Sequence, residues 1–155
     1  MLKAEMITLP LFEGVSTFRS FQLSAPRNFS FPFGMSRVPE EIRERTKKFP
    51  SAIVRLYTRL PRERRELEVL GHQLPRSGTS VAAHAREASR SRSEAELCSN
   101  LDGAIQEADE SMLWLELLRD DCDIGYNSIA RLHHEADEII AIFVTIVSRI
   151  RRSAR

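Results

Sequence analysis

The sequence has little of several residue types, and each scarcity excludes a class of protein. Its two cysteines, Cys98 and Cys122, lie 24 positions apart, which fits neither the CxxC spacing of a metal or redox site nor the cysteine density of a secreted scaffold. No uncharged apolar run reaches the roughly 18 residues of a membrane span, and no signal-peptide-like run precedes Pro10. We therefore predict a cytoplasmic protein that is neither exported nor embedded in a membrane.

Net charge is also small. The 23 basic and 22 acidic side chains leave a formal charge of +1, so the chain as a whole has no field that favours nucleic acid or an anionic membrane. The charges are nevertheless segregated: residues 37–92 hold 14 lysines and arginines against 7 acids, residues 93–140 hold 2 against 13, and residues 141–155 add four arginines. We expect the basic and acidic parts to pair within a subunit or between subunits.

A length of 155 residues suits one domain with a hydrophobic core. Residues 1–36 differ from the rest, because they hold six of the eight phenylalanines and show no helical period. The segment is broken every few residues by Pro10, Gly14, Pro26, Pro32 and Gly34. We interpret it as an irregular arm that is either disordered or docked through its phenylalanines. Met35 precedes the helical domain of residues 37–155, so a misassigned start is a third alternative.

Four stretches of residues 37–155 have apolar residues at 3-4 spacing, the pattern of amphipathic helices. The positions predicted to face the core are Ile42, Phe49, Ile53, Leu56 and Leu60 in the first, Leu67, Leu70, Leu74, Ser77, Val81, His84 and Ala88 in the second, Cys98, Leu101, Ile105, Ala108, Met112 and Leu115 in the third, and Ile129, Leu132, Ala136, Ile139, Phe143, Ile146 and Ile150 in the fourth. No strand-like alternation separates them. The sequence predicts an all-α fold, an up-down-up-down antiparallel four-helix bundle.

The fourth stretch has more apolar residues than one core-facing stripe needs. Ile140, Ile142, Val144 and Val147 lie off its main phase. A second buried face is therefore predicted, and a neighbouring subunit is the usual way to supply one.

Hydroxyls and a histidine interrupt the second stretch. Ser77 and His84 share the phase of the leucines, so we expect them to face inward and to form a buried network with Ser80. The alternative is a nucleophilic pair of Ser80 and His84. That pair lacks an oriented carboxylate, free backbone N–H groups and a GxSxG turn. We predict a structural role for these residues and no catalytic residue.

The histidines and acids give no pattern typical of a metal site. His133 and His134 are adjacent and point about 100° apart on a helix, and only His134 has a carboxylate four residues on, Glu138. The acidic run lacks the ExxH pairs of di-iron bundles and is interpreted as a solvated or intersubunit face. Its members are Glu107, Asp109, Glu110, Glu116, Asp120, Asp121 and Asp123. We predict no metal and no cofactor, and a hydrolase or metal enzyme is the least favoured alternative.

Two arginine clusters are the candidates for nucleic-acid binding. The first lies at a helix junction and the second at the C-terminus: Arg59, Arg62, Arg64 and Arg65, and Arg149, Arg151, Arg152 and Arg155. Nearby Glu63, Glu66 and Glu68 dilute the first cluster. Trp114 is predicted to lie in the core or in an interface.

Residues 72–118 resemble a family signature. The pattern is Gln-Leu-x-Arg-Ser-x-Thr-Ser, then Glu-Ala, and later Glu-Ala-x-Glu and Trp-Leu. Its members here are Gln73, Leu74, Arg76, Ser77, Thr79, Ser80, Glu87, Ala88, Glu107, Ala108, Glu110, Trp114 and Leu115. It is similar to that of four-helix-bundle proteins associated with 23S rRNA intervening sequences. His84 stands where that family usually has asparagine, and Leu97 where it usually has phenylalanine.

This resemblance implies a bundle that assembles into a ring-like homopentamer, in a family whose functions are largely uncharacterised. A related branch, the accessory protein of diversity-generating retroelements, binds a reverse transcriptase and RNA through a strongly basic surface, from which this chain differs in its charge of +1. We predict a non-enzymatic, homo-oligomeric assembly or binding module with an RNA or protein partner. An RNA-binding accessory factor that uses the arginine clusters is the alternative.

Overall fold

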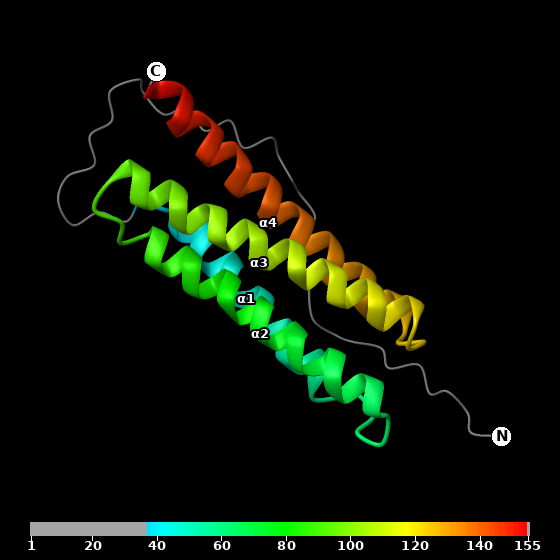
Figure 1. The fold of residues 1–155 in the computed structure, drawn as a ribbon. Coiled ribbons are helices and arrows are strands. Elements are labelled where there is room, and N and C mark those ends of the chain that lie inside the picture. The colour runs from blue at the N-terminus through cyan, green and yellow to red at the C-terminus, as the bar shows by residue number, and fades with distance from the viewer. Residues whose placement is uncertain (1–36, 155) are drawn as a thin grey trace. The chain divides into compact units, whose positions relative to one another are not determined.

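The computed structural model describes residues 37–154, which form four helices: α1 (Glu40–Tyr57), α2 (Arg65–Ala88), α3 (Glu94–Asp120) and α4 (Tyr126–Ser153). Each helix returns antiparallel to the one before it (Figure 1). Helix α2 packs on α1 and α3, and α3 packs on α4, whereas α1 makes only a small contact with α4. The described residues contain no strand, which confirms the predicted all-α bundle. The predicted arm, residues 1–36, lies outside the described residues.

The start of α3 shows how the sequence sets a helix boundary. The hydroxyl oxygen of Ser93 accepts a hydrogen bond from the backbone N–H of Glu96 (3.1 Å), and the Glu96 carboxylate accepts one from the backbone N–H of Arg92 (2.8 Å). This reciprocal pairing is close to a capping box and satisfies donors that the first turn leaves free. Before α4, Asp123 has a φ of 55°, a left-handed conformation that aspartate tolerates better than most residues.

Most of the predicted core positions are buried, but the buried stripe is displaced by one residue at several places. In α2, Gly71 is buried instead of the predicted Leu70, and Ala85 instead of His84. In α3, Ala104 is buried instead of Ile105, and Ser111 instead of Met112. In α4, Val147 is buried, whereas the predicted Ile146 and Ile150 are only partly buried. Two causes combine. A straight helix drifts by about 20° per heptad against a strict 3-4 repeat, and small side chains allow closely packed helices to approach each other.

Two glycines mark the closest approaches between helices. A Cβ added at Gly78 of α2 would overlap Cδ1 of Ile53 on α1, and one at Gly103 of α3 would lie 3.0–3.1 Å from the imidazole of His84 on α2. These positions hold α2 close to both of its neighbours.

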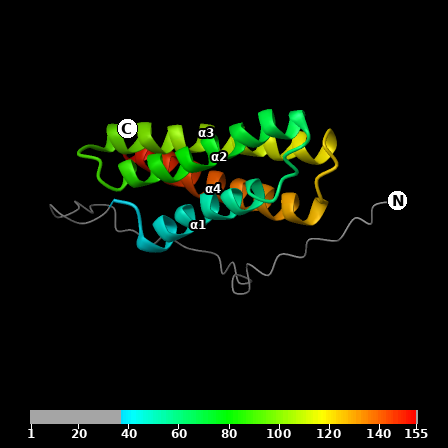
Figure 2. The same ribbon diagram turned by 90° about the horizontal axis from the view of Figure 1, so that it is seen from below.

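Helix α4 packs along α3 but diverges from α1. Figure 2 shows α4 close to α1 near its start and well separated from it towards its C-terminus. A bidentate ion pair makes the link between the two helices: Arg45 of α1 donates from Nε and Nη2 to the carboxylate of Glu135 at 2.6 and 3.0 Å, and Glu138 lies 3.7 Å from Nη2. In residues 37–154, no helix combines the length and apolarity that crossing a membrane requires.

Candidate functional site

The predicted inward orientation of Ser77 is correct, but its partner is on another helix. Ser111 of α3 donates a hydrogen bond to the hydroxyl oxygen of Ser77 at 2.9 Å, and both side chains are buried. Ser77 can also bond back to the carbonyl oxygens of Gln73 and Leu74, each at 3.3 Å. The pair links α2 to α3 inside an otherwise apolar core and favours one alignment of the two helices.

The predicted network of Ser77, Ser80 and His84 is therefore wrong. Ser80 bonds back to the carbonyl oxygen of Arg76 at 3.0 Å, as hydroxyls in helices commonly do. His84 is partly exposed, because the buried stripe passes through Ala85 instead. In the described part of the chain, no hydrogen bond joins Ser80 to His84, so the geometry of a Ser-His nucleophile is not formed.

The imidazole of His84 lies against Gly103 of α3. Its Nδ1 is shielded from solvent without a hydrogen bond and lies 3.5 Å from a carboxylate oxygen of Glu87, one turn along the helix. The ring therefore fills the space above a glycine, which is a packing role. Thr79 is exposed, and its hydroxyl bonds back to the carbonyl oxygens of Pro75 and Arg76.

The motif residues of α3 lie on the side of that helix facing α2. Glu107 and Glu110 are partly exposed, and Trp114 is half-buried with its Nε1 donating to the carboxylate of Glu110 at 3.1 Å. Trp114 packs against the core. The motif therefore contributes one serine, Ser77, to the buried hydroxyl pair, and it places charged side chains at the surface between α2 and α3.

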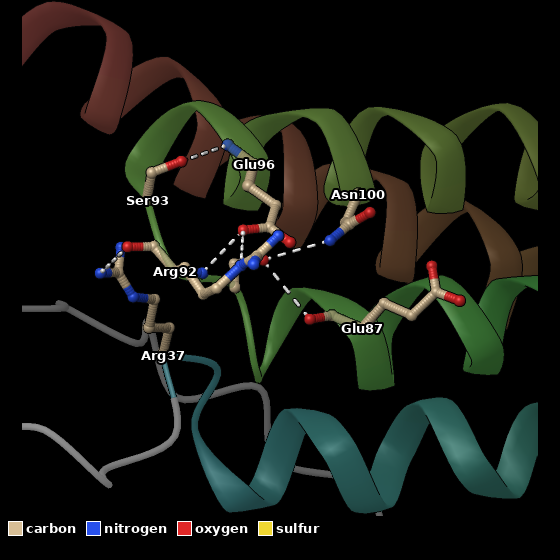
Figure 3. Close-up of polar contacts among 7 residues, drawn as sticks. Arg37, Glu87, Arg92, Ser93, Glu96 and Asn100 are labelled. Atoms are coloured by element: carbon tan, nitrogen blue, oxygen red, sulfur yellow. Dashed lines mark hydrogen bonds and ion pairs between the residues drawn. The ribbon is translucent and has the colours of Figure 1, made fainter.

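A groove of about 700 Å³ opens on this α2–α3 surface. Its lining comes from three helices and includes Pro50, Thr79, Ala82, Ala83, Arg86, Glu87, Arg90, Glu96 and Asn100. Figure 3 shows one end of it, where the amide of Asn100 donates to the hydroxyl of Ser91 at 3.1 Å and Glu96 caps α3. The backbone hydrogen bonds of Arg92 are the main cause that lowers the pKa of Glu96 below its usual value. The lining combines small side chains, Ala82 and Ala83 among them, with charged ones.

The two predicted arginine clusters do not form one surface. Arg59, Arg62, Arg64 and Arg65 lie at the α1–α2 connection, and Arg149, Arg151 and Arg152 lie at the opposite end of the bundle (Figure 1). Arg64 donates to Glu66 (2.7 Å) and to the carbonyl oxygen of Cys122 (2.8 Å), and Arg151 pairs with Asp102 at 2.5 Å. Arg155 lies outside the described residues. Some of these arginines therefore serve contacts within the bundle.

His133 pairs across helices rather than along α4. Its Nε2 lies 2.8 Å from a carboxylate oxygen of Glu116 on α3, which removes Glu116 from the predicted solvated acidic face. In the part of the chain that the structure describes, no three His, Cys, Asp or Glu side chains come together as a metal site. Both cysteines are buried, and burial raises the pKa of each thiol.

The C-terminal half of α4 carries a row of apolar side chains that the described part of its own subunit covers only in part. Ile142, Ile146 and Ile150 follow Glu135 and Glu138 at steps of three to four residues and so continue the side of α4 that faces α1. All three isoleucines are only partly buried. Helix α1 contacts this side at Arg45 and has diverged beyond it (Figure 2). We refer to these isoleucines as the α4 flank.

Some of these features escaped prediction from the sequence. Hydrophobicity favours Met112 over its smaller neighbour Ser111 as the core residue, although Ala104, Ala108, Ser111 and Leu115 keep the 3-4 spacing. The separation of the arginine clusters follows from the up-down topology, which places the first connection and the end of the fourth helix at opposite ends.

Comparison with known proteins agrees with this architecture. A family model described as 23S rRNA-intervening sequence protein matches residues 40–145. A crystal structure of a protein of unknown function from the S23 ribosomal protein family of Bacteroides thetaiotaomicron is 31% identical, with a TM-score of 0.65, and the match covers 70% of this chain and 96% of that one. Comparison with curated proteins gave no match. The chain belongs to the 23S rRNA-intervening sequence protein family.

Proposed function

We propose that this protein is a non-enzymatic assembly module of the cytoplasm, which forms homo-oligomers through the α4 flank. The observation that carries the proposal is the row of three isoleucines that remain only partly buried where α4 diverges from α1. An apolar face that its own subunit leaves uncovered is typical of a subunit interface. The resemblance in the α2–α3 motif implies a ring-like pentamer, and that stoichiometry is part of the proposal.

The free energy of burying the remaining apolar surface of the α4 flank favours self-association. Completing the burial of a partly buried isoleucine contributes at most about 1 kcal/mol, and each contact would bury several such side chains. Because Ile142, Ile146 and Ile150 already touch the core, they are held in place before association. Little side-chain entropy is then lost on binding.

The arrangement of polar groups supports a structural role. The hydroxyls of Ser77, Thr79 and Ser80 bond to backbone or to another serine, and the imidazole of His84 packs on Gly103. These contacts account for the conspicuous polar side chains of α2 without a reaction.

The test compares Ile146→Lys with Thr145→Lys by light scattering after size exclusion. Ile146 belongs to the α4 flank, whereas Thr145 is an exposed neighbour on another side of the helix. We expect Ile146→Lys to weaken association about 100-fold or more, because a lysine charge would be desolvated in the contact, and Thr145→Lys to keep the wild-type mass. Circular dichroism checks that both variants fold.

A monomeric wild type, or equal masses for the two variants, would overturn the proposal. The ratio of absorbance at 260 and 280 nm is read on the same peak at two salt concentrations. Nucleic acid that is bound at low salt and released at high salt would instead favour the RNA-binding alternative, because phosphate contacts weaken steeply with salt.

A further inference from the structure

Two small residues followed by two arginines form a row along the exposed side of α2. Thr79, Ala83, Arg86 and Arg90 recur at steps of three to four residues, and Arg90 lies in the turn just after the helix. All four are exposed, and all four line the groove described above. From Thr79 to Arg90 the row is about 17 Å long, or three helical turns. We call these four residues the α2 row.

The groove has a helix on each side of the α2 row. Pro50 contributes from α1, and Glu96 and Asn100 contribute from α3, and α2 packs between these two helices. Small-molecule sites bury most of the surface of their ligand, whereas this groove is open along its length. An open groove with small residues in its lining and a helix on either side suits another helix, because small side chains let two helix axes approach each other.

The groove holds two positive charges that the bundle does not use. The guanidinium groups of Arg86 and Arg90 make no hydrogen bond or ion pair with any residue that the structure describes. The two carboxylates in the lining are already placed: Glu96 caps α3 (Figure 3), and an oxygen of Glu87 lies 3.5 Å from Nδ1 of His84. Two arginines one turn apart therefore remain to bind an anionic partner.

We propose that this groove binds an acidic amphipathic helix of a partner protein. Two carboxylates four residues apart on that helix repeat at the same interval as Arg86 and Arg90, so each would accept a charge-assisted hydrogen bond. Uncharged side chains of the same face would cover Ala83 and Pro50. The groove belongs to α1, α2 and α3 and does not include the α4 flank. The inference therefore goes beyond the proposed function and stands or falls independently of it.

The surroundings of the groove disfavour a nucleic acid as its occupant. Glu87 and Glu96 line it beside the arginines, and Glu107 and Glu110 are partly exposed further along α3. A nucleic acid carries a phosphate at every nucleotide, so its backbone would meet these carboxylates. A helix can carry acids only where the arginines lie and uncharged side chains elsewhere.

The test measures binding of a synthetic helical peptide to the full-length protein by fluorescence anisotropy. The labelled probe is alanine-rich and about 20 residues long, since shorter helices are marginal in water. It carries leucines along one face and two glutamates, four positions apart, at the N-terminal end of that face. The control peptide has the same composition with its glutamates on the opposite face. We expect the probe to bind at least about tenfold more tightly than the control peptide, and its binding to weaken with salt.

A charge reversal locates the binding at the arginines. Arg86→Glu combined with Arg90→Glu would place like charges opposite each other, so we expect the affinity for the probe to fall by about tenfold or more. The matched control combines Arg55→Glu with Arg131→Glu, which changes the net charge equally at two exposed arginines outside the groove. It should keep the wild-type affinity.

A second pair of variants tests the shape of the groove without changing its charge. Ala83→Tyr would fill the space that a partner helix needs, so it should lower the affinity for the probe although both arginines are intact. Ala141 is an exposed alanine of α4, and Ala141→Tyr should have no effect. Circular dichroism on every variant separates loss of binding from loss of folding.

The inference would be overturned if the wild type failed to bind the probe, if both peptides bound equally, or if the groove variants bound like their controls. Tighter binding of a single-stranded RNA oligonucleotide that the arginine reversal abolishes would also overturn it, in favour of a phosphate site.

Its failure can be told apart from failure of the proposed function. Ile146→Lys leaves the groove intact and should bind the probe like the wild type, and the groove variants should keep the wild-type mass in light scattering. A monomeric wild type that binds the probe would support the groove and remove only the α4 flank. An oligomeric wild type that does not bind it would remove only the groove.

Discussion

At the scale of single residues, the bundle depends on small side chains where two helices come closest. Gly78 lies directly against Ile53, which is fully buried. Gly103 lies against the imidazole of His84, and Ser111 reaches Ser77. Close-packed interiors respond to a single methyl group, so each of these positions limits what its partner can be.

Gly78→Ala tests this at the closest approach. The new methyl group would overlap Cδ1 of Ile53, and overpacking of this kind costs about 1–3 kcal/mol, against about 1 kcal/mol gained in helix propensity. We expect a net loss in the free energy of unfolding, measured by urea denaturation. In an Ile53→Val background, which removes Cδ1, the same substitution should be neutral or stabilising. Equal effects in both backgrounds would contradict the packing explanation.

The same residues explain what could be read from the sequence. The 3-4 spacing predicted four helices and their order, because large apolar residues dominate each stripe. It misplaced the core at Leu70, Ile105 and Met112, since hydrophobicity favours these residues over the smaller Gly71, Ala104 and Ser111 that are buried. Which of two neighbouring residues is buried depends on how near the facing helix lies. That distance depends on the side chains of both helices, so the apolar pattern of one helix alone does not predict it.

At the scale of elements, α2 and α3 form the most extensive helix pair, and its connection is tightly bonded. Arg37 donates from its backbone N–H to the carbonyl oxygen of Ser89 at 3.3 Å and from its guanidinium to that of Arg92 at 3.4 Å, which ties the start of the domain to this connection (Figure 3). Ser93 and Glu96 then cap α3.

The cap of α3 predicts a defined pH dependence. The folded state lowers the pKa of Glu96, first through the backbone N–H of Arg92. Its contribution to stability is therefore present above the usual glutamate pKa and is lost as the pH falls through the lowered value. We expect Glu96→Gln to melt at a lower temperature than the wild type near neutral pH, with the difference shrinking in acid. Glu94→Gln, two residues earlier and without this bond, is the control. A difference that does not change with pH would contradict the assignment.

At the scale of the whole molecule, the bundle is closed unevenly. Three of its four helix contacts join neighbours in the chain, and the fourth, between α1 and α4, is small and centres on Arg45 with Glu135. The hydrogen bond to the carboxylate of Glu135 is the main cause that raises the pKa of Arg45 above its usual value. This weak closure leaves the α4 flank only partly covered within the subunit.

Uneven closure also has a kinetic meaning. A chain whose main contacts are local has a low contact order and folds fast. The Arg45–Glu135 link between α1 and α4 joins residues 90 positions apart. We therefore expect this link to form after the rate-limiting step of folding. We expect Arg45→Ala to speed unfolding while leaving the folding rate nearly unchanged, as measured in stopped-flow denaturant jumps. Slower folding of the Arg45→Ala variant would show that the link is already formed in the folding transition state, which would contradict this expectation. If it forms late, the contact between α1 and α4 is the first to open during unfolding, and the Arg45–Glu135 ion pair slows that opening.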